Sequence, residues 1–421
     1  MASLLTAEFG CTGIAGLGTP ADGAAPSDSG PADSGAGPGD GGNGDTYLPW
    51  EGGPAYYARW GYGPPANTNY FPIAVWLQSA VNAPAYRAIG INTYIGLSQD
   101  TTNAELAALN DAGTQTICDQ DLDWMSHLSD PTIDGWRIPQ DEPDNAQPVT
   151  DGGSGYGPCI APATIVAEYD TQVAADPNRP MFLNLGQGVA YIDYPGRGSA
   201  CAGQTSMYPM YAAGADLLSF DIYPVNNTDA TTGGNLWYVA TGVDNLRGWA
   251  DYQKPVWNWI ETTGIEDPTH TPTPAQIKTE VWMSLVHGSM GIGYFCHIFS
   301  PSFIEAGLLS LPVNAAAVAA IDAEIESLAP VLNTRSLSNG ATVVSSNVAV
   351  PVDIMVKRYA GKLYVFAVAM RSAATTATFT LRNGTTATAS VLGEARSISV
   401  DGGNFSDTFA PYDVHLYEIA P

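Results

Sequence analysis

Two glutamates lie at or just after the ends of apolar runs, where their carboxyl groups could take part in acid–base or nucleophilic chemistry. Glu142 follows the apolar run 133–140, and Glu261 ends the apolar run 254–261. A single carboxyl at such a place is often a capping or surface group. Two carboxyls that face one another across a substrate bond can instead share its cleavage, because one donates a proton while the other attacks as a nucleophile. Such a pair needs a fold that brings two distant strand ends together.

Eight short apolar runs recur along the middle of the chain, with helical patterns between several of them. The runs cover 71–78, 91–97, 114–119, 133–140, 180–186, 215–224, 254–261 and 291–299. The helical patterns cover 103–113, 161–177 and 273–290. Apolar strands that alternate with helices predict a parallel sheet covered on its outside. Eight of them favour an α/β fold, the (β/α)8 barrel, and no glycine-rich phosphate loop follows the first strand to support a Rossmann fold.

In a (β/α)8 barrel, active groups gather at the carboxyl ends of the strands. The polar and aromatic residues expected there are Trp76, Gln78, Asp119, Gln120, Asp121, Asp141, Glu142, Asn184, Gln187, Asp221, Tyr223, Trp257, Trp259, Glu261 and His297. We expect Glu142 and Glu261 to lie on opposite sides of the barrel mouth.

The stretches around the two glutamates resemble a known group. QDEPD (140–144) and WIETTG (259–264) resemble the acid/base and nucleophile signatures of the clan A glycoside hydrolases, which are retaining (β/α)8 enzymes. The resemblance covers about residues 71 to 300. It implies that Glu142 is the acid/base and Glu261 the nucleophile, about 5–5.5 Å apart, in the hydrolysis of a β-linked poly- or oligosaccharide.

The same resemblance assigns supporting roles. Tyr223 would hydrogen-bond the nucleophile and keep it ionised. The predicted sugar-stacking platforms are Trp76, Trp257 and Trp259, since the apolar face of a sugar packs well on an indole. From their places at the strand ends, Asp141, Gln78, Asn184 and His297 are also predicted to bind substrate. The reaction implied requires no cofactor and no metal.

Asp141 departs from the clan pattern, which usually has Asn before the acid/base glutamate. An ionised aspartate accepts a hydrogen bond from a sugar hydroxyl but cannot donate one. An adjacent Asp–Glu pair is also typical of substrate-assisted β-N-acetylhexosaminidases, in which the Asp orients the acetamido group and the Glu is the acid/base. A further alternative is a non-catalytic surface carbohydrate-binding protein, which would keep the tryptophans without needing both glutamates.

The two ends of the chain differ from the middle in composition and in hydrophobic pattern. Residues 19–46 are almost wholly Gly, Ala, Pro, Ser and Asp. Such a segment has too few apolar side chains to form a folded core, so we predict that 1–46 is a disordered segment and linker. Beyond residue 335, apolar and polar residues alternate and helical patterns vanish, which predicts an antiparallel β-sandwich over 335–421. The barrel domain would then span 47–334.

The net charge of −27 argues against nucleic acid and other anionic polymers as partners. No apolar run is long enough to cross a membrane. Cys159 and Cys201 flank one predicted helix–strand unit and are a candidate disulfide, which would suit an exported protein. Cys11 precedes the linker and resembles the lipidated cysteine of a bacterial lipoprotein. We therefore expect a secreted or cell-surface protein, with a lipid anchor at Cys11.

Overall fold

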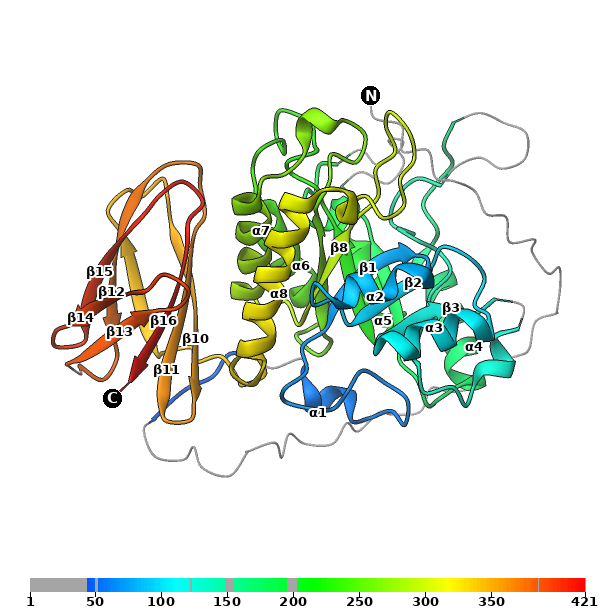
Figure 1. The fold of residues 1–421 in the computed structure, drawn as a ribbon, viewed down its shortest axis with the longest axis horizontal. Helices are drawn as coiled ribbons and strands as arrows, with labels where there is room; N and C mark the ends of the chain where they lie inside the picture. The colour runs from blue at the N-terminus through cyan, green and yellow to red at the C-terminus, as the bar shows by residue number, and fades with distance from the viewer. Residues whose placement is uncertain are drawn as a thin grey trace. The chain divides into compact units, whose positions relative to one another are not determined.

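The computed structural model describes residues 44–49, 52–121, 123–147, 155–194, 203–384 and 386–420. Eight parallel strands form a closed barrel in chain order (Figure 1). They are β1 (Ile73–Gln78), β2 (Thr93–Leu97), β3 (Gln115–Asp119), β4 (Ile133–Arg137), β5 (Met181–Leu185), β6 (Leu217–Asp221), β7 (Val256–Glu261) and β8 (Gly291–Phe295). Strand β1 pairs with both β2 and β8, which closes the barrel. The predicted fold class is confirmed.

Helices connect the strands and pack around the outside of the barrel (Figure 1). They are α2 (Ala83–Arg87), α3 (Asn103–Ala112), α4 (Pro162–Ala175), α5 (Tyr208–Ala213), α6 (Tyr238–Trp249), α7 (Pro274–Val286) and α8 (Pro312–Leu332), while α1 (Pro54–Tyr57) precedes β1. Thr102 and Thr273 begin α3 and α7 with capping boxes, in which the threonine hydroxyl and the side chain three residues on satisfy free backbone N–H groups. The three predicted helices thus form within about four residues of their predicted ends.

The barrel interior is filled by large side chains facing small ones. Trp257 and Trp259 alternate on the inner face of β7 and are each 1% exposed. Opposite them on β8, a Cβ added at Gly291 would lie 2.6 Å from the Trp257 ring, and one at Gly293 would lie 2.3 Å from the Trp259 ring. The two glycines therefore provide the space that the two indoles occupy.

The C-terminal strands form two antiparallel sheets, as predicted. The five-stranded sheet has the order β10-β11-β16-β13-β14 and the three-stranded sheet the order β15-β12-β9. The strands are β9 (Ala341–Ser345), β10 (Val352–Tyr359), β11 (Lys362–Ala369), β12 (Thr375–Leu381), β13 (Ala387–Val391), β14 (Arg396–Val400), β15 (Asn404–Phe409) and β16 (Val414–Ala420). Between the sheets lies an apolar core that includes Phe379, Phe405 and Tyr417.

The barrel and the β-sandwich belong to one compact unit, 45–421. Trp282 of α7 packs against Phe366 of β11 with ring centroids 5.2 Å apart, and the Thr279 hydroxyl donates to the Tyr412 carbonyl at 2.6 Å. The predicted boundary at 334/335 falls between the end of α8 and the start of β9. In the described part of the chain, no helix is long and apolar enough to span a membrane. The predicted linker and Cys11 lie outside the described residues, apart from residues 44–46.

Candidate active site

Glu142 lies at the barrel mouth, in the loop that follows β4. Its backbone is left-handed, with φ at 47°, a conformation that costs energy in a residue other than glycine. Hydrogen bonds hold it there, because the Glu142 N–H donates to the Asn184 carbonyl at 3.2 Å and the Glu142 carbonyl accepts from the Asn145 N–H at 2.9 Å. The Asn145 side chain also donates to Glu142 Oε2 at 2.9 Å. The carboxyl is thus held in one fixed orientation.

A second carboxyl, that of Asp221 at the end of β6, lies within hydrogen-bond reach of Glu142. Asp221 Oδ1 is buried, and no donor among the described residues reaches it. Burial raises the pKa of Asp221 well above its usual range, and the charges of Glu142 and Asp141 raise it further. This environment favours the protonated form of Asp221. The sequence placed Asp221 at the mouth but assigned it no role.

Asp141 is positioned by a relay that starts in the barrel core. The Asn184 amide donates to Asp141 Oδ1 at 3.0 Å, and Asn184 Oδ1 accepts from the Ser219 hydroxyl at 2.7 Å. The Ser219 oxygen in turn accepts from the Trp259 indole N–H at 3.1 Å. Two of the predicted substrate-binding residues, Asp141 and Asn184, are therefore brought together next to Glu142.

Glu261 ends β7 as predicted, but its carboxylate is completely buried, with 0% of the residue exposed. The N–H groups of Val225 and Asn226 donate to its two oxygens at 2.6 and 2.8 Å, and the Asn226 side chain donates as well. Glu280 of α7 contacts it from the helix side. Burial raises the pKa of Glu261 to about 7, although these donors oppose the shift. Glu261 is thus enclosed by the loop after β6.

Tyr223, which follows β6, is affected by the charges of both glutamates. Burial raises the pKa of its hydroxyl, followed by the charges of Asp221, Glu142, Asp141 and Glu261. No hydrogen bond joins Tyr223 to Glu261 among the described residues. The predicted contact that would keep the nucleophile ionised is therefore not present, and Val225 and Asn226 supply the donors instead.

Beside the carboxyls lies an ion pair that the sequence reading did not identify. Arg137, the last residue of β4, donates to both oxygens of Asp119 at 2.7 and 2.8 Å. Its guanidinium lies over the Trp76 ring, 5.1 Å from the centroid. Asp119 and Arg137 are register partners on neighbouring strands, so the pairing could have been found from strand alignment. Trp76 is 5% exposed, which leaves little indole surface for a sugar.

The predicted tryptophan platforms on β7 lie deeper than expected. Trp257 packs against Phe182, and its indole N–H reaches the Tyr57 hydroxyl at 3.4 Å. Trp259 contacts Trp76 edge to face, with centroids 4.8 Å apart. Both indoles are part of the barrel core, and neither offers a free face to a sugar in this structure.

Gln78 and His297, which lie near the ends of the neighbouring strands β1 and β8, contact one another. The Gln78 amide nitrogen and His297 Nε2 are 3.2 Å apart, and His297 Nε2 also lies 3.2 Å from the Leu77 carbonyl. Gln78 is fully buried and accepts from the Tyr86 hydroxyl at 2.8 Å. Burial lowers the pKa of His297, which favours the neutral imidazole. These contacts fasten two loops to one another.

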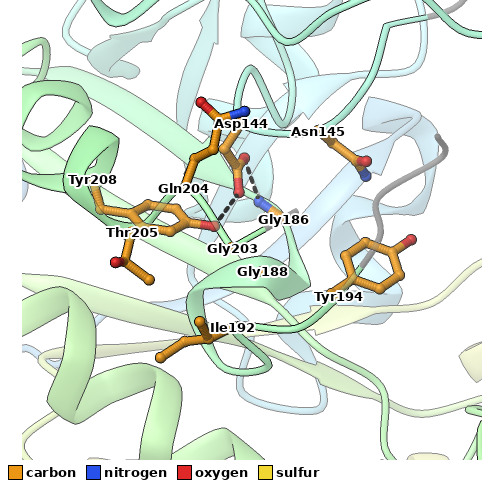
Figure 2. A pocket seen from close by; sticks show the side chains of 10 residues that line it. All are labelled: Asp144, Asn145, Gly186, Gly188, Ile192, Tyr194, Gly203, Gln204, Thr205 and Tyr208. Atoms are coloured by element: carbon orange, nitrogen blue, oxygen red, sulfur yellow. Dashed lines mark hydrogen bonds between the residues drawn. The ribbon is translucent and has the colours of Figure 1, made fainter. Parts of the chain in front are cut away.

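Asn145, which donates to Glu142, also lines a pocket with several polar side chains (Figure 2). Asp144 projects into it, where one oxygen accepts from the Gly186 N–H at 2.9 Å and the other from the Tyr208 hydroxyl at 3.0 Å. Burial raises the pKa of Asp144 to about 7, despite both donors, and the charge of Glu142 contributes. Tyr194, Gln204 and Thr205 complete the polar lining. Asp144 belongs to the same QDEPD stretch as Glu142, the signal that could have identified it.

Other predicted features are described only in part. Cys159 is disulfide-bonded, but Cys201 lies outside the described residues, so their pairing stays a prediction. Cys118 and Cys296 are buried free thiols. Within the described ranges, no group of three or more His, Cys, Asp or Glu side chains is arranged to hold a metal ion.

Comparison with known proteins gives similarity of structure alone. No family model matches the chain, and no curated protein matches its sequence. An endoxylanase from Clostridium papyrosolvens is similar with a TM-score of 0.47 and 13% identity, over 90% of this chain and 98% of that one. An Anoxybacillus alpha-amylase has a TM-score of 0.44 and 7% identity, over 84% of this chain and 99% of that one. An alpha-L-arabinofuranosidase from Thermotoga petrophila has a TM-score of 0.44 and 10% identity, over 81% of this chain and 89% of that one.

Proposed function

We propose that the protein is a glycoside hydrolase in which Glu142 is the proton donor. The observation that carries the proposal is the fixed geometry of Glu142. Its backbone is held left-handed at the barrel mouth, its Oε2 accepts from Asn145, and the carboxyl of Asp221 lies against it. Strained backbone of this kind is concentrated at functional sites. A positioned carboxyl that can hold a proton is what the departure of a glycosidic oxygen requires.

In the first mechanism, Glu261 attacks the anomeric carbon of a β-linked sugar while Glu142 protonates the leaving oxygen. Glu142 then activates water, and the sugar leaves with retained configuration. Because Glu261 is fully buried beneath Val225 and Asn226, this mechanism requires the loop after β6 to shift when substrate binds. The two N–H donors would favour the ionised form that a nucleophile needs.

A specific observation favours a second mechanism. Glu261 has no exposed surface, whereas Asp141 lies at the mouth beside Glu142 and is held there by Asn184. In a substrate-assisted β-N-acetylhexosaminidase, the acetamido group of the sugar is the nucleophile and an aspartate orients it. Asp141 would fill that role and Glu142 would remain the acid/base. Glu261 would then be a structural carboxylate that anchors the loop after β6.

Three isosteric variants separate the mechanisms in initial-rate assays on aryl β-glycosides and polysaccharides. Glu142→Gln should remove most activity under either mechanism. Under the first mechanism Glu261→Gln is also inactive, and azide added to Glu261→Gly yields an α-glycosyl azide. Under the second, Asp141→Asn loses activity on 2-acetamido substrates while Glu261→Gln, if folded, retains it. Activity that survives both glutamine changes would contradict the hydrolase proposal for this site.

The carbohydrate-binding alternative predicts a different outcome. A protein of that kind would retain polysaccharide without cleaving it, and the glutamine variants would bind as well as the wild type. Affinity electrophoresis in gels containing β-glucan, xylan or glycol chitin distinguishes binding from turnover. Secretion and a lipid anchor at Cys11 remain part of the proposal, and mass spectrometry of the protein from its native cells tests for the lipid.

A further inference from the structure

The loop after β8 forms a small fixed hairpin over residues 298–304. Ile298 and Ile304 exchange backbone hydrogen bonds at 3.0 and 2.8 Å. At its end, Glu305 fastens the hairpin to the loop after β1. Its carboxylate accepts from the N–H of Ser79 and, at 2.9 Å, from the Ser79 hydroxyl, and its carbonyl accepts from the Gln78 amide at 2.9 Å. The β8 hairpin is therefore a pre-organised element.

Four rings on and beside this hairpin form a contiguous group, which we call the aromatic shelf: Phe295, His297, Phe299 and Phe303. The His297 ring is nearly parallel to those of Phe299 and Phe303, at 16° and 19°, with centroids 5.9 and 5.8 Å away. Phe299 and Phe303 are 5.6 Å apart. Phe303 is 59% exposed. A scattered apolar side chain at the surface is ordinary, but here an exposed ring is held in a fixed stack.

The aromatic shelf is in contact with Tyr223 of the candidate active site. Phe295 lies 5.2 Å from Tyr223 and 5.0 Å from His297, centroid to centroid. The charges of Asp221 and Glu142 act on the Tyr223 hydroxyl. An unbroken series of rings thus leads from Tyr223, on which the charge of the proposed proton donor acts, to the solvent-exposed Phe303.

The chemistry of the shelf selects among ligands. Flat rings pack against the C–H face of a sugar. The net charge of −27 and the nearby carboxyls disfavour an anionic chain. We propose that the aromatic shelf is a secondary sugar-binding site for a neutral glycan chain that extends beyond the cleaved bond, with Phe303 as its outermost platform. This deepens, and rests on, the proposed hydrolase function.

The test compares Phe303→Ala with Phe303→Trp and with Tyr359→Ala, a control that removes a 41% exposed aromatic from the β-sandwich. Each is assayed on aryl monoglycosides and on cello-, xylo-, manno- and chito-oligosaccharides. Loss of one stacking platform should raise KM for the cleaved oligosaccharide about tenfold. Its kcat, and both constants for the aryl monoglycoside, should stay unchanged. Phe303→Trp should restore KM, and Tyr359→Ala should match the wild type.

The outcomes separate the shelf from the hydrolase proposal. Cleavage with an unchanged KM for oligosaccharides in Phe303→Ala would overturn the shelf while the hydrolase stands. Failure to cleave any glycan, combined with retardation in glycan-containing gels that Phe303→Ala abolishes, would overturn the hydrolase and support the shelf. Neither cleavage nor retardation would overturn both. Tighter binding of chitosan oligomers than of their neutral N-acetylated counterparts would overturn the choice of a neutral ligand.

Discussion

Glu280 provides a quantitative test of how the end of β7 is built. It lies on α7 with no exposed surface, and neither carboxyl oxygen has a hydrogen-bond donor within the described residues. Burial raises its pKa well above the usual range, and the charge of Glu261 raises it further. The folded protein therefore favours the protonated form of Glu280 more strongly than the unfolded chain does. Glu280→Gln keeps the size of the side chain and removes that titration.

The sign and size of the effect follow from proton linkage. A folded-state pKa above the unfolded value means that wild-type stability falls as pH rises, from the unfolded pKa up to the folded one. The slope is about 1.4 kcal/mol per pH unit for each extra proton that the folded state holds. Between about pH 5 and pH 7, the free energy of unfolding of Glu280→Gln should therefore rise relative to that of the wild type, by at most about 1.4 kcal/mol per pH unit.

Urea unfolding followed by tryptophan fluorescence, at several pH values across that interval, measures the difference. Glu326→Gln is the matched control, because Glu326 is 43% exposed and pairs with Arg87 at the surface, so its stability curve should run parallel to that of the wild type. Parallel curves for Glu280→Gln as well would refute a protonated, buried Glu280 and with it the described environment of Glu261.

Two further substitutions test the packing and the relay. Gly293→Ala places a Cβ 2.3 Å from the Trp259 ring and should lower the free energy of unfolding by about 1–3 kcal/mol, whereas Gly61→Ala, with its nearest atom 3.9 Å away, should not. Equal denaturation midpoints for Gly293→Ala and the wild type would contradict the described packing of β8 against Trp259. Asn184→Asp replaces the amide that donates to Asp141 with a carboxylate. It should lower the free energy of unfolding by about 1–3 kcal/mol near pH 8, and this loss should be recovered near pH 4. The variant should also lose activity. A pH-independent effect would contradict the relay.

The strands were predictable because buried parallel strands are continuous apolar runs, but their ends were not. The run 215–224 contains β6 over Leu217–Asp221 only, and the run 291–299 contains β8 over Gly291–Phe295. The residues beyond β8 are as apolar as the strand because they form the β8 hairpin and the aromatic shelf. Hydrophobicity alone cannot distinguish a strand from an apolar loop that packs on its end.

At the site, the sequence could place residues at strand ends but not their depth or partners. Alternation along β7 puts Trp257 and Trp259 on one face, and only the glycines of β8 show that this face is filled core. The burial of Glu261 depends on the loop after β6 and on Glu280, which are distant in sequence. Local pattern reading carries no information on such contacts.

The claim that Glu142 is the proton donor is tested most directly by how the loss in Glu142→Gln depends on the leaving group. General acid catalysis supplies about 10²–10⁴ in rate, and a good leaving group needs little of it. The account predicts that kcat/KM falls by about 10³ on an unactivated β-glycoside and by less than about tenfold on the matching dinitrophenyl β-glycoside. An equal loss on both substrates, or no loss on either, would contradict it.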